Sequence, residues 1–295
     1  MIHIIDLKFQ KQKEAIASFL MDTGDGLALV ETGPHSRFHT LKAGIEEAGY
    51  KVEDVKHVFI THIHLDHAGA CWAFAELGAT IYLHPFGFRH MANPEKLMSS
   101  AKRIYQDRMD ELWGEMRPIP ESQLRTVAHE EVITVGNLSF KSWHTPGHAV
   151  HHIAWQLDDV LFAGDVAGVR INKGIVMAPC PPPDINIEDW INSIELVRSL
   201  KCKKLYITHY GEIEDIENHL SELERLLHDW ASFIKPHYLA GKKPKEVIPE
   251  FQAYVKKQIL DHGMSEEEVG QYEAANPAWM SVAGLMRYWH KKLNA

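Results

Sequence analysis

The sequence predicts an α/β fold with one helical insertion and a helical C-terminal region. Up to His84, short apolar strands alternate with amphipathic helices, which is typical of layered α/β proteins. Between about residues 86 and 125 the spacing becomes helical, and beyond Gly211 only helical patterns remain. We therefore expect a core over residues 1–211, interrupted by the insertion, and a helical region over residues 212–295 that packs on the core.

Turn residues and apolar runs define the elements before the insertion. A TGDG turn at 23–26 separates two strands, and Gly49 and Gly78 cap the C-terminal ends of two helices. The expected strands are Ile2–Lys8, Ala15–Asp22, Leu27–Glu31, Val55–Thr61 and Thr80–His84, and the expected helices are Phe38–Ala48 and Ala70–Leu77.

The later elements follow from the same criteria. The insertion is predicted to be helical over Lys96–Met116, because its apolar residues recur at helical spacing. Strands are expected again at Val132–Val135, Leu138–Trp143, Ile153–Leu157, Val160–Ala163 and Lys204–Thr208. The expected later helices are Ile187–Leu200, Ile213–Phe233, Pro244–His262, Ser265–Ala274 and Trp279–Leu293.

Composition and charge restrict the class of function. The 31 basic and 40 acidic residues give a net charge of −9, whereas nucleic-acid binders normally carry a basic stripe. No run of 18 apolar residues is present, and Asp6 and Lys8 interrupt the start where a signal peptide needs an apolar stretch. We therefore expect a cytoplasmic protein that binds a small-molecule substrate and neither a nucleic acid nor a membrane.

The segment FITHIHLDHAG, residues 59–69, carries the strongest chemical signal. An apolar strand runs into His62 and His64, whose side chains point to the same side while the backbone stays extended. The bend into the next helix would turn Asp66 and His67 toward a neighbouring point. A lone histidine is more often structural, but this spacing of imidazoles and a carboxylate predicts a site for Zn²⁺, Fe²⁺ or Mn²⁺.

Three later segments also place a metal-ligating side chain after an apolar strand. They are Leu138–His148, ending in His148, Val160–Asp165, ending in Asp165, and Leu205–His209, ending in His209. Taken singly, the three residues could be a turn residue, a helix cap and a surface histidine. Taken together, they place ligands at strand ends along one edge of a sheet sandwich, where such folds build sites.

The motifs THIHLDHAG, TPGH, FAGD and THYG, in this order over residues 61–211, resemble the metallo-β-lactamase superfamily of hydrolases. The resemblance implies an αββα sandwich with a dinuclear centre between its halves. It implies ligands for two divalent ions: His62, His64 and His148 for the first, Asp66, His67 and His209 for the second, and Asp165 bridging both. Zinc is the first expectation for these ions, with iron and manganese as alternatives.

The resemblance also implies roles for residues around the ions. A hydroxide between the ions would attack the substrate, and Asp66 would act catalytically by shuttling the proton. Glu31 stands where the family usually has a supporting aspartate. His152 matches the second histidine of the glyoxalase II and lactonase branch, and we expect His152 and Tyr210 to bind substrate; packing roles for both stay open.

The complete ligand set favours a dinuclear hydrolase that acts on a small ester, thioester or lactone. The alternative is an iron-dependent oxidoreductase, similar to persulfide dioxygenases, on the same scaffold. A metal-stabilised scaffold without activity is disfavoured, because no ligand is missing. Apolar helices outside the core leave a homodimer open.

Overall fold

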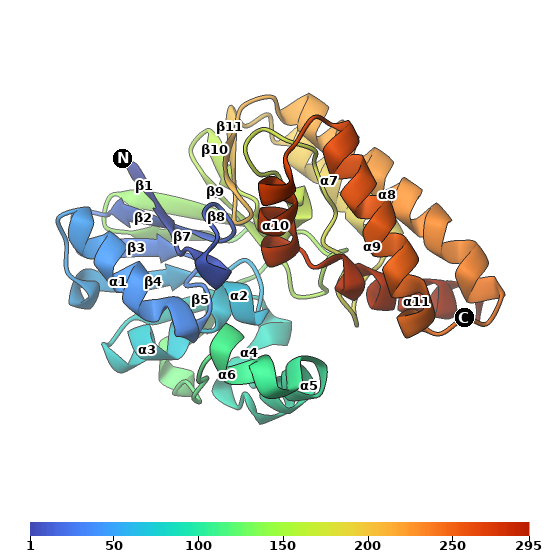
Figure 1. Ribbon diagram of the computed structural model, residues 1–295. Helices are drawn as coiled ribbons and strands as arrows, with labels where there is room; N and C mark the ends of the chain where they lie inside the picture. Colours follow the sequence, from blue (N-terminus) through green and yellow to red (C-terminus); the bar gives the residue numbers. More distant parts are fainter. Residues whose placement is uncertain (295) are drawn as a thin grey trace.

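The computed structural model describes residues 1–294 and contains two mixed sheets of six strands each (Figure 1). The first sheet has the order β1-β2-β3-β4-β5-β6, with β1 Ile2–Asp6, β2 Ala17–Asp22, β3 Leu27–Val30, β4 Val55–Phe59, β5 Thr80–Leu83 and β6 Leu124–Thr126. The second has the order β12-β11-β10-β9-β8-β7, with β7 Val132–Val135, β8 Leu138–His144, β9 Ile153–Leu157, β10 Val160–Phe162, β11 Lys204–Ile207 and β12 Gly211–Ile213.

The two sheets pack face to face through aromatic side chains. In β3, Ala28 and Val30 belong to this core between the sheets, whereas Leu27 and Leu29 belong to the core on the outer side. This division follows from the two-residue period of a strand. Phe59 of β4 stacks on Phe140 of β8 with ring centroids 4.3 Å apart, which fixes how the strand ends of the two sheets meet.

Helices cover the outer faces of both sheets (Figure 1). The first sheet packs against α1 (Phe38–Glu47) and α3 (Cys71–Glu76), and the second against α7 (Ile187–Ser199) and α8 (Ile216–Leu239). Apolar residues of α8 recur every three or four positions and are fully buried, among them Leu220, Leu223, Leu227, Trp230 and Ile234. The predicted α/β class and αββα sandwich are confirmed.

The insertion is more broken than the sequence predicts. It contains α4 (Pro85–Ala92), α5 (Glu95–Tyr105) and α6 (Met109–Leu112), so the helical character predicted over Lys96–Met116 is present as far as Leu112 but is divided between separate helices. Gln106, with φ of 48°, cannot continue an α-helix. The helix α5 therefore ends before Gln106, and Tyr105 packs edge-on against Trp113, with the ring centroids 4.9 Å apart.

The C-terminal region is helical but begins with a strand that the sequence analysis missed. Ile213, predicted to start a helix, pairs with Leu205 in the antiparallel edge strand β12. The remaining helices are α9 (Pro244–Asp261), α10 (Glu266–Ala275) and α11 (Ala278–Leu293), and Ala295 of the predicted region lies outside the described residues. None of the helices within residues 1–294 combines the length and apolar character needed to cross a bilayer.

Candidate metal centre

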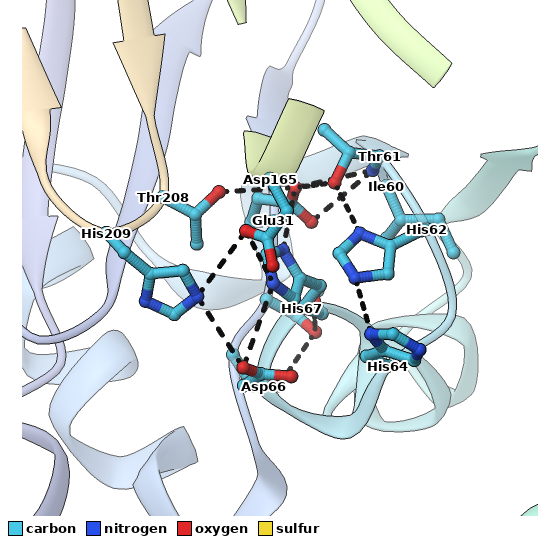
Figure 2. Close-up of polar contacts among 12 residues, drawn as sticks. Glu31, Ile60, Thr61, His62, His64, Asp66, His67, Asp165, Thr208 and His209 are labelled. Carbon is cyan, nitrogen blue, oxygen red and sulfur yellow. Dashed lines mark hydrogen bonds and ion pairs between the residues drawn. The ribbon is translucent and has the colours of Figure 1, made fainter. Parts of the chain in front are cut away.

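The structure brings all seven predicted ligands to one place, where strands of both sheets end. Figure 2 labels His62, His64, Asp66, His67, Asp165 and His209. β4 leads into His62 and His64, and the first turn of α2 (Leu65–Ala68) carries Asp66 and His67. The second sheet supplies the other three, which follow β8, β10 and β11: His148, Asp165 and His209. The seven side chains therefore lie close together where the strands end.

Three imidazoles form the first group of ligand atoms. His62 Nε2 lies 2.9 Å from His64 Nδ1, and His148 Nε2 lies 3.1 Å from the same atom. His62 and His148 are each 1% exposed. Three nitrogens at this separation can surround one ion.

The second group contains two imidazoles and a carboxylate. Asp66 Oδ2 lies 3.8 Å from His67 Nε2 and 3.5 Å from His209 Nε2. The ligand atoms of Asp66, His67 and His209 all lie within 4.8 Å of one another. This is a second candidate position for a cation, beside the first.

Asp165 lies between the two groups and faces each with a different oxygen. Its Oδ2 is 3.3 Å from His148 Nε2, and its Oδ1 is 3.4 Å from His67 Nε2 and 3.5 Å from His209 Nε2. The preceding Gly164 has φ of 50°, and a Cβ there would stand 2.6 Å from Thr61 Oγ1. A larger residue would therefore push the Asp165 loop away from β4.

In His148 and His209, the ring nitrogen that points away from the centre donates a hydrogen bond to a backbone carbonyl. The other ring nitrogen, which points into the centre, therefore has a free lone pair for a metal ion. His148 Nδ1 lies 2.8 Å from the Pro179 carbonyl oxygen, and His209 Nδ1 lies 2.6 Å from that of Ala15. A carbonyl oxygen only accepts, so each Nδ1 carries the proton and each Nε2 is unprotonated in the neutral ring. Such contacts orient metal ligands.

The nitrogen and oxygen atoms that face one another in the centre fit a bound cation better than a network of hydrogen bonds. The lone pairs of His62 Nε2 and His148 Nε2 both face His64 Nδ1, which has at most one proton to donate. Within residues 1–294, His67 Nε2 and Asp165 Oδ1 are buried without a hydrogen-bond partner. Buried polar atoms rarely stay unpaired, and divalent metal ions would satisfy them.

Glu31, expected to support the ligands, hydrogen-bonds to residues of the centre. It is fully buried, and its Oε1 accepts hydrogen bonds from Thr61 Oγ1 at 2.5 Å and from His67 Nδ1 at 3.2 Å. Because the Thr61 hydroxyl donates to Glu31, its oxygen accepts from His62 Nδ1 at 3.0 Å. One carboxylate therefore orients a histidine of each group.

The histidine pKa values differ between the two groups of ligand atoms, as His64 and His67 show. Burial lowers the pKa of His64 to about 3, so this imidazole is neutral and able to bind a metal. Burial also opposes charge on His67, but the carboxylates of Asp165, Glu31 and Asp66 outweigh it and raise the pKa of His67 well above its usual range. The carboxylates thus attract a positive charge to the second group, either a proton or a metal ion.

The two predicted substrate-binding residues lie away from the open side of the centre. His152 is fully buried, with Nδ1 2.7 Å from Thr145 Oγ1 and Nε2 accepting from the Val166 amide at 3.4 Å. Tyr210 packs against the core between the sheets. Neither lines the cavity described next, and their contact with substrate stays a prediction.

A cavity of about 1080 Å³ opens on the centre, lined at its base by His64, Asp66 and Asp165. His151, the residue before His152, lines this cavity, and its buried Nδ1 has no hydrogen-bond partner among the described residues. Tyr105 of α5 and Trp279 of α11 are further lining residues. No sequence motif marks these two, because they come from the insertion and the C-terminal region.

The fold and the site together define a metal-binding αββα sandwich. The family model of the Metallo-beta-lactamase superfamily matches residues 13–209, and the chain belongs to this superfamily. The predicted family resemblance is thereby confirmed. Members of this superfamily are largely hydrolases.

Individual relatives share sequence similarity with the chain, and a solved structure shares its fold. The chain is 28% identical over 178 residues to the metallo-beta-lactamase fold-containing protein ST1585 of Sulfurisphaera tokodaii, covering 58% of this chain and 67% of that one. It is 22% identical over 205 residues to an atrochrysone carboxyl ACP thioesterase of Aspergillus fumigatus, covering 69% of this chain and 39% of that one. The crystal structure of the Thermus thermophilus family protein TTHA1429 superposes with a TM-score of 0.67 at 20% identity, over 99% of this chain and 93% of that one.

Proposed function

We propose that the protein is a hydrolase that binds two divalent ions, zinc in the first instance, and cleaves a small ester, thioester or lactone. The observation that carries this proposal is Asp165, whose two oxygens face two separate groups of ligand atoms. A bridging carboxylate is the arrangement expected where two ions act on one substrate. The net charge of −9 supports a small substrate over a nucleic acid, and the thioesterase among the relatives supports acyl transfer to water.

In the proposed reaction, different residues of the chain would transfer the proton and hold the metal ligands in place. Two bound ions would lower the pKa of a water molecule and polarise the bond to be cleaved. Asp66 lines the cavity and keeps its side chain 23% exposed, so its carboxylate can accept a proton from the attacking water and return it to the leaving group. His148 and His209 stay fixed through their carbonyl partners.

Metal content and substrate turnover, measured on the same purified protein, test this function. We expect two metal ions per chain and hydrolysis of at least one compound in a panel of esters, thioesters, lactones and phosphodiesters. Removal of the ions with a chelator should abolish turnover, and zinc should restore it. One bound iron with oxygen consumption and no hydrolysis would overturn the proposal in favour of the iron-dependent oxidoreductase.

His151 is expected to contact the substrate without holding a metal. It lines the cavity, but it is not a member of any of the candidate ligand groups among the described residues. His151→Phe, which keeps a ring but removes both ring nitrogens, should raise KM by about tenfold, the loss of one hydrogen bond to a polar group, with the metal content unchanged. If the variant loses a metal ion, or keeps the KM of the parent protein, this role is wrong.

A further inference from the structure

The cavity above the centre is larger than a substrate of a few carbon atoms needs. Its volume is about 1080 Å³, whereas pockets that enclose drug-sized ligands span roughly 300–1,000 Å³. Its lining comes from the insertion, from the loop at Pro181–Pro183 and from the C-terminal region, in addition to the metal centre. In Figure 1 the insertion helices α4–α6 lie at the bottom of the view, below the strands of the first sheet, and α11 lies at the lower right.

Aromatic side chains form one part of the cavity wall and connect the two added regions. Tyr105 of α5 packs against Trp113 at 4.9 Å and against Trp279 of α11 at 6.1 Å. The Tyr105 hydroxyl lies 3.2 Å from Met280 Sδ, a weak acceptor. The wall is therefore apolar and is shaped by residues about 175 positions apart in the chain.

Apolar side chains continue from this wall to the mouth of the cavity. Phe86, Ile104 and Val150 all line the cavity, and they are 66%, 39% and 44% exposed. Exposed large apolar residues that gather around a pocket indicate a binding surface. They extend the apolar contact beyond the enclosed volume.

Cations on α5 stand at the same mouth. Lys96 and Arg103 line the cavity, are exposed, and have no ion-pair partner within residues 1–294. The carboxylates in the lining outside the metal centre, Asp184 and Glu273, come from the proline-rich loop and from α10. Unpaired cations on a protein with a net charge of −9 create a local positive potential that attracts anions.

We propose that the substrate is an ester or thioester with two unlike ends, one bulky and apolar and one anionic. The apolar end packs on the Tyr105 wall, and the anionic end, a phosphate or a carboxylate, binds Lys96 and Arg103. This inference rests on the proposed hydrolase function, since the bond to be cleaved would lie at the metal centre on which the same cavity opens. Water adds across that bond, so that one product carries a new carboxylate and the other a new hydroxyl or thiol.

Binding of thioethers tests the substrate class without any turnover, because a thioether cannot be hydrolysed. The probes share an S-octyl group and differ in the other end: S-octyl coenzyme A carries phosphates, S-octyl glutathione carries carboxylates, and S-octyl N-acetylcysteamine is neutral. In calorimetry at low salt we expect both anionic probes to bind at least about tenfold more tightly than the neutral one. At about 1 M salt, where the screening length is about 3 Å, most of this advantage should disappear.

Charge-reversal variants on α5 locate the anion site, with a neighbouring residue as the matched control. Arg103→Glu and Lys96→Glu should each remove most of the preference for the anionic probes and leave binding of the neutral probe within about twofold. Lys102→Glu makes the same change one position away, on an exposed residue that does not line the cavity, and should keep the preference. Ile104→Ser should weaken all three probes, whereas Val132→Ser, exposed on β7, should weaken none.

The outcomes separate this inference from the proposed function. Equal affinities for charged and neutral probes, or the same loss in Lys102→Glu as in Arg103→Glu, would overturn the substrate class even if the enzyme hydrolyses simple esters. If only one anionic probe is preferred, the anion is assigned to phosphate or to carboxylate accordingly. Absence of hydrolysis on every panel substrate would overturn the function, while selective binding of the anionic probes would still establish the ligand class.

Discussion

Replacement of Asp165 by alanine is expected to remove the paired metal ions and the hydrolytic turnover together. The two Asp165 oxygens face different ligand groups, at 3.3 Å from His148 Nε2 and at 3.4 Å from His67 Nε2, so no other side chain can replace both contacts. Loss of a residue that only orients a ligand lowers metal affinity or activity by about 10–100-fold. We expect a larger loss here, with metal content falling from two ions to one or fewer.

Two variants serve as controls for this result. Asp159→Ala removes an exposed carboxylate that immediately precedes β10 and pairs with Lys203 at 2.8 Å, and it should keep metal and turnover. Asp165→Asn keeps the side-chain volume but supplies one weak oxygen ligand, and it should retain at most one ion. Full metal content and full turnover in Asp165→Ala would exclude a bridging role.

Much of this centre could be predicted from the sequence because its ligands are encoded locally. Each follows an apolar strand, and the ends of paired strands must lie near one another in a sheet. β10 and β11 pair in parallel, with Phe162 opposite Tyr206, so Asp165 and His209 necessarily emerge at the same edge. The alternation of strands and helices determined the class of fold in the same way.

Features that depend on contacts between distant segments could not be predicted. The strand β12 has few residues and depends on its pairing with β11, in which Ile213 lies opposite Leu205. The strand β6 depends in the same way on β5, with Leu124 opposite Ile81. The Pro179 and Ala15 carbonyls that orient His148 and His209 carry no sequence signature. Any residue type supplies a backbone carbonyl, so only the fold reveals which one is used.

The substrate cavity was the least predictable part for the same reason. Tyr105 and Met280 meet in the cavity wall although neither lies near the ligand motifs. The sequence indicates that the insertion and the C-terminal region contain apolar helices, but helical spacing does not reveal which partner an apolar face contacts. The candidate metal ligands and the cavity walls therefore come from different parts of this chain: the strand ends carry the ligands, and the added helices shape the space above them.

Glu31 offers a sharp test of how the protein positions its metal ligands. Glu31→Gln keeps the shape of the side chain but removes its charge, so the His67 and Thr61 donors lose their carboxylate acceptor at 3.2 Å and 2.5 Å. We expect metal affinity to fall by about 10–100-fold and turnover to fall with it. Titration of the metal-free protein with zinc measures the affinity, and denaturant unfolding of the metal-free protein measures its stability.

A contrast between metal affinity and stability identifies the role of Glu31. Glutamine fills the same buried space as Glu31, and its amide oxygen can still accept from Thr61 and His67 in the metal-free protein. Affinity should therefore fall while the free energy of unfolding changes little. Thr208→Val, which removes only a 3.5 Å contact to Glu31, should leave both unchanged, and Glu31→Asp should recover part of the affinity because it restores the charge. Equal losses of affinity and stability in Glu31→Gln would instead make Glu31 a residue that holds the fold together and positions the ligands only indirectly.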